Sequence, residues 1–405
     1  MSTSLQRGAT VVMLWLLASL PEAHGQQRLG PSPVATVDLH TNAEWRVNAP
    51  IEFDPTGRLL ILYRDKFKLR PSGNWHLIRL ADPLSAKPLR EEITFSIPQE
   101  PVNPRAADRW IGFHSHLLLS ADGRRAYATF SGTVVTAKPG PRLATGGENV
   151  KVGLFSSVAS FDLRAFRLLA CAEVELPPTP DSQRVDAEGN LLLLSQTDTD
   201  WTIAALDESL RKIKAVIISM APVSKGERFF CQLRPDYMLE CPASGGGDPV
   251  FILGPQSTVQ LPRSACKRTS GPGPLEFGRD ETVVNGIVQS ARLCIRNDSG
   301  QEERVASDPL TRCYGDWRPD VISPDHRSLL VSCSEVESFL DMFFTSKVTL
   351  QLVDALTLAS RATIPLSTRR RSTYTVFHHS GTTTIAVLED GWKLALYNLT
   401  DQRES

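Results

Sequence analysis

Arginine recurs in this sequence near the start of segments that alternate between apolar and polar residues, often beside tryptophan or an acid. Five such arginines are Arg46, Arg109, Arg184, Arg228 and Arg318. A guanidinium group binds carboxylate, phosphate or sulfate through paired hydrogen bonds. If the five segments converge, their arginines could bind an anionic ligand. The alternative, which we favour, is that each arginine pairs with a neighbouring acid and has a structural role.

Histidines form a second set of candidate groups. His114 and His116 are two residues apart, so in a β-strand their imidazoles lie on one face, and His378 occupies the corresponding place in a later segment. Imidazole titrates near neutral pH and acts as an acid, a base or a metal ligand. No cluster of carboxylates accompanies these histidines. We therefore favour structural or solvated roles, keep the three as weak catalytic candidates, and expect no metal site.

The chain contains seven cysteines, an odd number, so at least one thiol stays outside any intrachain disulfide. Cys231 and Cys241 are equidistant from Asp236, the centre of a predicted hairpin. Equal offsets make them cross-strand neighbours and predict a disulfide, the alternative being two buried thiols. We find no C-x-x-C spacing, nucleophile elbow or dinucleotide fingerprint, and therefore expect no cofactor.

These candidates must be positioned by strands, and one strand unit recurs along the chain. It consists of an apolar strand, a four-residue turn ending near glycine, and a second strand rich in Leu, Val or Tyr. The clear copies of the turn are 54–57, 120–123, 186–189 and 323–326, and the weaker copies are 234–237, 278–281 and 379–382. Proline fits the second position of such a turn, while glycine or aspartate tolerates the backbone angles that follow.

Two further strands follow each turn. The third strand opens on tryptophan in three copies, at Trp75, Trp201 and Trp392. In several copies it ends on an acid or amide whose side chain can bond the backbone two residues on: Asp82, Asp162, Asp207, Asp354 and Asn398. The segment 131–152, rich in Gly, Pro and Thr, is predicted to be a loop. Four antiparallel strands per repeat of about 40 to 60 residues are typical of a propeller blade.

The repeats also carry a family resemblance. SADGRRAYATF with VASFDLRAFRLLACAEVELP, and SPDHRSLLVSC with KVTLQLVDALTLASRATIPL, resemble the YVTN/WD40-like β-propeller repeats of secreted bacterial proteins. The resemblance implies an all-β fold in which residues 26–405 form a single seven-bladed β-propeller of four-stranded antiparallel blades. Residues 229–310 depart most from the pattern because they lack the turn glycine. Six or eight blades therefore stay open as alternatives.

The two ends of the chain predict how such a ring closes. After the last turn the sequence supplies only two strands, 384–388 and 392–399, whereas residues 34–39 form a strand with no hairpin partner of its own. We expect the N-terminal strand to pair in the last blade, which completes four strands and removes two exposed edges. In this ring the arginine-bearing innermost strands converge at one mouth of the central channel.

The first 25 residues are predicted to be a secretory signal peptide. Arg7 supplies a short positive region, residues 11–20 are apolar, and small residues follow at 23–25. Ten apolar residues are too few to span a bilayer, and no later segment is long and apolar enough to do so. We expect a periplasmic or secreted protein, in a compartment where disulfides persist.

Two functions fit these features. The chain carries 44 basic and 45 acidic residues, a balance that argues against nucleic acid as a partner. The first hypothesis is an exported binding or protein-interaction scaffold whose partner is a protein or an anionic small molecule or glycan. The alternative is a lactonase-like hydrolase or a lyase that acts on an anionic, acidic sugar-like substrate at the central channel. The sequence does not decide whether the protein is an enzyme, because a propeller fold hosts both kinds of site.

Overall fold

The structure is a computed structural model of the chain. It describes residues 31–39, 49–64, 74–85, 88–98, 109–136, 151–174, 183–221, 231–241, 250–261, 267–270, 275–284, 287–297, 303–305, 310–311, 314–315, 321–335, 347–366, 372–389 and 393–400. The elements assigned within these residues are all β-strands, β1 to β30. The predicted all-β fold is therefore confirmed.

The described strands form seven antiparallel sheets, numbered here in chain order. The first sheet contains β2 (Ile51–Phe53), β3 (Leu59–Arg64), β4 (Trp75–Leu80) and β5 (Arg90–Phe95). The second contains β6 (Arg109–Leu119), β7 (Arg125–Thr136), β8 (Lys151–Asp162) and β9 (Arg167–Glu173). The third contains β10 (Gln183–Val185), β11 (Leu191–Gln196), β12 (Asp200–Leu206) and β13 (Lys212–Ser219). The fourth contains β14 (Gln232–Leu233), β15 (Leu239–Cys241), β16 (Val250–Leu253) and β17 (Thr258–Leu261).

The last three sheets are less uniform. The fifth contains β18 (Lys267–Ser270), β19 (Leu275–Val284), β20 (Ile287–Asn297), β21 (Glu303–Val305) and β22 (Leu310–Thr311). The sixth contains β23 (Tyr314–Gly315), β24 (Val321–Ile322), β25 (Ser328–Glu335), β26 (Lys347–Asp354) and β27 (Ser360–Leu366). The seventh contains β28 (Ser372–His379), β29 (Thr382–Glu389), β30 (Lys393–Thr400) and, from the other end of the chain, β1 (Ala35–Asp38).

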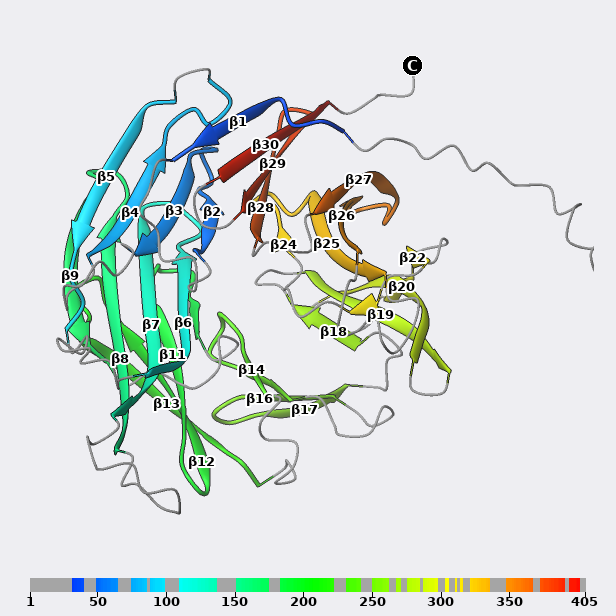
Figure 1. The fold of residues 1–405 in the computed structure, drawn as a ribbon. Helices are drawn as coiled ribbons and strands as arrows, with labels where there is room; N and C mark the ends of the chain where they lie inside the picture. The colour runs from blue at the N-terminus through cyan, green and yellow to red at the C-terminus, as the bar shows by residue number, and fades with distance from the viewer. Residues whose placement is uncertain are drawn as a thin grey trace, which may run out of the picture.

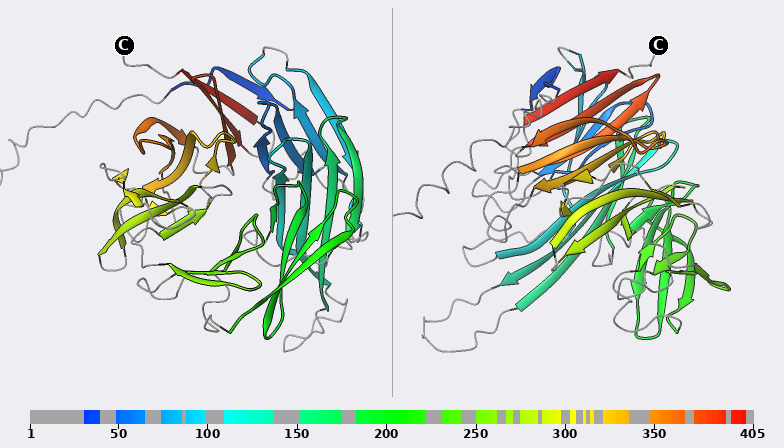
Figure 2. Two further views of the ribbon diagram at one scale, coloured as in Figure 1. Left: turned by 180° about the vertical axis from the view of Figure 1, so that it is seen from behind. Right: turned by 90° about the vertical axis from the view of Figure 1, so that its right-hand side faces the viewer.

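The sheets follow one another in chain order around a common centre (Figures 1 and 2). Within the first four sheets each strand is bonded to the next along the chain, so each sheet is a simple meander. Four-stranded antiparallel sheets repeated in this way are the architecture of a β-propeller.

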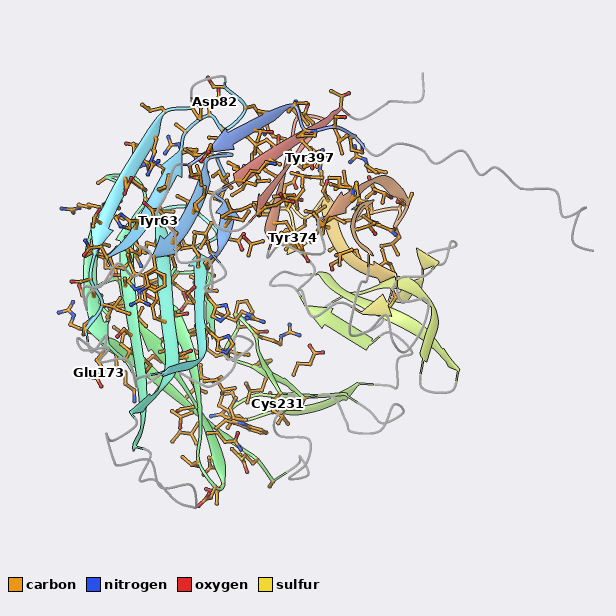
Figure 3. All side chains as sticks on the ribbon, viewed as in Figure 1. Tyr63, Asp82, Glu173, Cys231, Tyr374 and Tyr397 are labelled. Carbon is orange, nitrogen blue, oxygen red and sulfur yellow. A yellow bond between two sulfur atoms is a disulfide. The ribbon has the colours of Figure 1, made fainter. Side chains whose placement is uncertain are left out.

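The core lies in layers between neighbouring sheets. Trp75 of the first sheet is fully buried, and its ring centroid lies 4.4 Å from that of Phe130 in the second sheet. Tyr63 belongs to the layer between the seventh and first sheets, and Tyr374 to the layer between the sixth and seventh (Figure 3). Each core cluster of the described residues contains side chains from two neighbouring sheets, so these sheets stabilise one another.

Most of the predicted turns are present, and their backbone explains the residues at their fourth position. Gly57, Gly123 and Gly189 have φ values of 83°, 64° and 82°, in the left-handed region that glycine adopts at no steric cost. Tyr237 and His326 occupy the same position with φ values of 64° and 58°. The weak copy of the turn in the fourth sheet and the clear copy in the sixth therefore have the same left-handed residue at the fourth position as the glycine turns.

One predicted turn and part of one predicted loop are wrong. Residues 278–281 lie inside β19, where Gly278 is opposite Cys294 and Glu281 is opposite Ala291. The predicted loop at 131–152 is strand at 131–136 and 151–152, because β7 and β8 continue pairing as far as Thr136 and Lys151. The β-branched run at 133–136 favours this extension.

The two ends of the described chain meet in the seventh sheet. β1 pairs antiparallel with β30, with Ala35 opposite Leu396 and Asp38 opposite Lys393. In addition, β2 of the first sheet contacts β28 of the seventh. Both relationships join the N-terminal part of the fold to its C-terminal part.

Candidate functional site

The five predicted anion-binding arginines are only partly described. Arg46, Arg228 and Arg318 lie outside the described residues, and Arg109 is the first residue of β6, where only the backbone is described. Arg184 on β10 is half-buried, and its Nη1 donates a hydrogen bond of 2.7 Å to the carbonyl oxygen of Gln183. The anion-binding set therefore stays a prediction.

The three candidate histidines lie on two different sheets. His114 and His116 are on β6, where His114 is exposed and His116 half-buried. His378 is on β28 in the seventh sheet and is only 5% exposed. Its Nδ1 lies 2.6 Å from Oδ2 of Asp325, in the turn that joins β24 to β25. This contact joins His378 of the seventh sheet to the sixth sheet.

The predicted cysteine pair is at disulfide distance. The Sγ atoms of Cys231 and Cys241 are 2.16 Å apart, on either side of the hairpin formed by β14 and β15. Cys171 on β9 is a free thiol, and burial raises its pKa to about 11. A thiol with this pKa stays protonated at neutral pH and is a poor nucleophile.

A feature that the sequence did not predict is that hairpin turns on neighbouring sheets contact one another. We call these turns the turn belt. They are residues 54–57, 120–123, 186–189, 234–237, 323–326 and 380–381. A Cβ atom added to Gly57 would lie 2.7 Å from Cε1 of Phe377, and one added to Gly123 would lie 2.7 Å from Cδ of Pro55. The turn of the first sheet is thus packed against the seventh sheet on one side and the second on the other.

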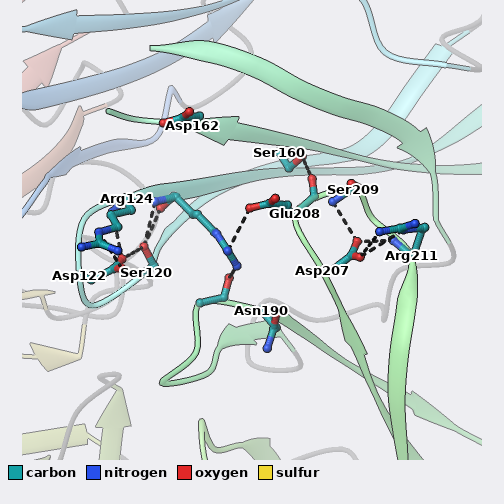
Figure 4. A network of polar contacts seen from close by, with 12 residues as sticks. Ser120, Asp122, Arg124, Ser160, Asp162, Asn190, Asp207, Glu208, Ser209 and Arg211 are labelled. Atoms are coloured by element: carbon teal, nitrogen blue, oxygen red, sulfur yellow. Dashed lines mark hydrogen bonds and ion pairs between the residues drawn. The ribbon is translucent and has the colours of Figure 1, made fainter. Parts of the chain in front are cut away.

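Polar contacts continue the turn belt from the second sheet to the third (Figure 4). Tyr127 donates a hydrogen bond of 2.8 Å to the carbonyl oxygen of Gly189, which also accepts a longer one, 3.4 Å, from Arg125. The same guanidinium group lies 3.0 Å from the Glu208 carboxylate, in the turn between β12 and β13. Ser160 of β8 donates to the carbonyl oxygen of Glu208. Arg125 therefore bridges two turns of the neighbouring sheet.

The third and fourth sheets are joined by a phenol. The hydroxyl of Tyr237 donates a hydrogen bond of 2.8 Å to Oδ2 of Asp186. Burial, together with this bond to a carboxylate, raises the pKa of Tyr237. Nζ of Lys214, on β13, lies 3.8 Å from the centroid of the Tyr237 ring. Tyr237, whose backbone is in the left-handed conformation, thus contacts both Asp186 and Lys214 of the preceding sheet.

A carboxyl group lies at the junction between the first and seventh sheets. Glu52 on β2 is half-buried and accepts a hydrogen bond of 3.3 Å from the hydroxyl of Thr375 on β28. Burial raises the pKa of Glu52 to about 7, although the bond from Thr375 opposes this rise. Beside it, the hydroxyl of Thr373 donates a hydrogen bond of 2.7 Å to the carbonyl oxygen of Ala49.

The side chains in these contacts are of types that can take part in catalysis, but in this structure they join neighbouring sheets. No group of three or more His, Cys, Asp or Glu residues that could hold a metal ion occurs in the described part of the chain. Nor do the same residues contain a helix of the length and apolarity needed to cross a membrane. Sequence reasoning found the glycine turns but missed their inter-sheet partners, because nothing in the spacing of Asp186 and Tyr237 or of Asp325 and His378 distinguishes those residues from other polar ones.

Comparison with known proteins gives structural neighbours of low similarity. No protein-family model matches the chain, and no curated protein matches it. The chain is similar to the β-propeller domain of the trilobed protease from Pyrococcus furiosus, with a TM-score of 0.46, 10% identity, and 88% of this chain and 96% of that chain covered. For the β-propeller domain of Cps50 (Swd1) from Myceliophteria thermophila the TM-score is 0.43, with 9% identity and coverage of 91% and 100%. For an uncharacterized protein of Listeria monocytogenes EGD-e the TM-score is 0.47, with 9% identity and with 88% of this chain and 97% of that chain covered.

Proposed function

We propose that this chain is an exported, seven-bladed β-propeller that acts as a binding scaffold rather than an enzyme. Residues 26–405 form one propeller domain, and residues 1–25 are a signal peptide that directs the protein to the periplasm or out of the cell. The partner is a protein or an anionic small molecule or glycan, bound on the surface of a rigid ring.

The seven described sheets and the pairing of β1 with β30 support the blade count and the closure. Contact between β2 and β28 is also what a closed ring requires, because it brings the first and last blades together. The cysteine pair at disulfide distance is consistent with an oxidising compartment.

The observation that carries the scaffold proposal is the contact between His378 and Asp325. His378 is one of the three candidate acid–base residues, yet it is almost fully buried and lies 2.6 Å from a carboxylate of the neighbouring sheet. A general acid or base must reach the proton that it transfers. A histidine held between two sheets does not meet that condition, whereas it does stabilise a rigid ring.

Two measurements test the proposal. Purified mature protein is first assayed for turnover of a panel of sugar lactones and acidic glycans, with His114→Ala and His378→Ala as variants. We expect no turnover above background, and we expect His378→Ala to unfold at a lower temperature while His114→Ala does not. Turnover that His114→Ala abolishes without a change in unfolding temperature would contradict the scaffold proposal and support the hydrolase or lyase.

Export is tested separately by fractionation and N-terminal sequencing. The mature protein is expected outside the cytoplasm, beginning close to residue 26. A full-length protein retained in the cytoplasm would overturn the proposed localisation without affecting the proposed fold.

A further inference from the structure

We propose that two copies of this chain associate through antiparallel pairing of β13 with β13, on a two-fold axis at Ala215. β13 is the outer strand of the third sheet, since it pairs with β12 alone in the described strand order. An outer strand presents backbone donors and acceptors on its open side, where a strand of another molecule can add to the sheet.

β13 exposes large apolar side chains, which is unusual in the described part of this molecule. Ile213 is 53% exposed and Ile217 is 64% exposed. The other exposed large apolar residues of the described chain, Val34, Leu89 and Leu356, each lie on a different segment. Only β13 therefore places two of them on one strand.

Ile217 shares a face of the third sheet with Ala215. On the opposite face, Val216 and Ile218 pack in the core layer between the third and fourth sheets, and Lys214 lies over the Tyr237 ring. Because side chains alternate along a strand, Ala215 and Ile217 point away from that layer. The register with β12 shifts at this end of the strand, so that Ile213 lies opposite no β12 residue and stays outside the core.

Of the other outer strands whose side chains are described, β1, β5 and β27 carry features that oppose strand addition, whereas the five inner residues of β9 are half-buried rather than exposed. β5 opens with Arg90, Glu91 and Glu92, and β27 contains Pro365. β1 has only four residues. Charges, proline and short length all block edge-to-edge pairing. β13 has eight residues and no proline, and its last five residues are uncharged.

The sequence of β13 is complementary to itself in the antiparallel direction. With Ala215 opposite Ala215 of the second copy, Ile213 of each copy lies opposite Ile217 of the other. Lys212 then lies opposite Ile218, and Lys214 opposite Val216, so no lysine faces a lysine. A parallel arrangement would instead place Lys212 and Lys214 beside their own copies, and like charges that face each other across strands are destabilising. The charge pattern therefore selects a second copy in the antiparallel orientation.

Cross-linking tests this register directly. In a Cys171→Ser background, Ala215→Cys places two thiols on residues that face each other, with Cα atoms about 4.5 to 5.5 Å apart, a separation that a disulfide spans. Ser219→Cys is the matched control, because its two copies lie eight residues apart along the paired strands, about 26 Å. We expect mild oxidation to give a covalent dimer with Ala215→Cys and not with Ser219→Cys. Equal cross-linking of the two variants, or none with Ala215→Cys, would overturn the proposal.

Sedimentation analysis tests the association without a covalent bond. The mature protein is examined from about 1 to about 100 µM, beside Ile217→Lys and the control Leu89→Lys. Leu89 is exposed to a similar extent but lies outside β13. We expect a concentration-dependent dimer that Leu89→Lys retains and that Ile217→Lys weakens at least about tenfold, because a lysine would be buried opposite Ile213. A protein that is monomeric throughout, or an Ile217→Lys variant that dimerises as the wild type does, would contradict it. The first of these results would favour an extended segment of a different protein as the occupant of this edge.

Discussion

Nδ1 of His378 and Oδ2 of Asp325 lie 2.6 Å apart, although the two residues belong to different sheets. Asp325 also accepts hydrogen bonds from the hydroxyl of Ser323 and the backbone N–H of Arg327 in its own turn. One carboxylate therefore closes a hairpin and binds the next sheet. Burial opposes its ionisation, but the bonds from Ser323 and His378 hold the pKa of Asp325 below its usual 3.8.

Replacing either member of this pair is expected to destabilise the protein. Asp325→Asn and His378→Ala should each lower the free energy of unfolding at neutral pH by about 1 to 3 kcal/mol, since each removes the hydrogen bond to a charged group that joins the two sheets. His114→Ala is the control, because His114 is exposed. The measurement is urea unfolding followed by tryptophan fluorescence.

The pH dependence of the same variants separates this contact from simple loss of packing. Because the pKa of Asp325 is lowered in the folded state, its contribution is present above pH 3.8 and is lost as pH falls below that value. The cost of Asp325→Asn should therefore shrink in acid. A cost that is the same at neutral and acidic pH would show that the carboxylate charge plays no part.

Two substitutions at the fourth position of turns in the turn belt should have opposite effects on stability. Gly57→Ala should destabilise the protein by at least about 1 to 2 kcal/mol, because alanine is strained at a φ of 83° and its Cβ would meet the Phe377 ring. His326→Gly should stabilise it by about 1 kcal/mol, since His326 holds a φ of 58° at a cost that glycine does not have. Thermal unfolding of both variants checks the signs. Two shifts in the same direction would contradict this account of the turns.

The fold was largely predictable from the sequence, whereas the contacts between sheets were not. Turn residues such as Gly123 and Gly189 have local conformational requirements, which leave a local signal at regular spacing. Residues 278–281 lacked that signal, and in the structure they belong to a strand. The partners of Tyr237 and His378 lie 51 and 53 residues away, and they are selected by three-dimensional packing that no local pattern encodes.

The cysteine pair could be predicted because its two residues are close in sequence. Cys231 and Cys241 flank one short hairpin, so the turn alone fixes which residues face each other. Arg46, Arg228 and Arg318 lie outside the described residues, and the proposal that they form an anion-binding set stays a prediction.

Glu52 predicts a second pH dependence, of opposite sign. Its pKa rises from 4.5 to about 7 on folding, so between these values the unfolded chain ionises first and stability falls as pH rises. Glu52→Gln carries no charge in either state, and the variant should gain stability relative to the wild type as pH increases from about 4.5 to about 7. Glu188→Gln, at an exposed position in the turn belt, is the control. A Glu52→Gln variant that follows the wild type at every pH would show that Glu52 is not buried against β28.

Removing the cysteine pair should cost stability in the fourth sheet. The residues are ten apart in sequence, and a loop of this size corresponds to about 2 to 3 kcal/mol. The double variant Cys231→Ser, Cys241→Ser should therefore unfold at lower denaturant concentration, whereas Cys171→Ser should change little. Unfolding with and without reductant provides the check, and a wild type that is insensitive to reductant would contradict the predicted bridge.

The most direct test concerns ring closure. Thr36 of β1 lies opposite Ala395 of β30, so Thr36→Cys with Ala395→Cys should form a disulfide within one molecule and raise the unfolding temperature. Thr36→Cys with Asn398→Cys is the control, because Asn398 lies three residues beyond Ala395 on β30, about 10 Å along the strand. We expect an intramolecular disulfide in the first variant only. A protein in which no such bond forms, or in which the thiols join only separate molecules, would show that the N-terminal strand does not close the ring.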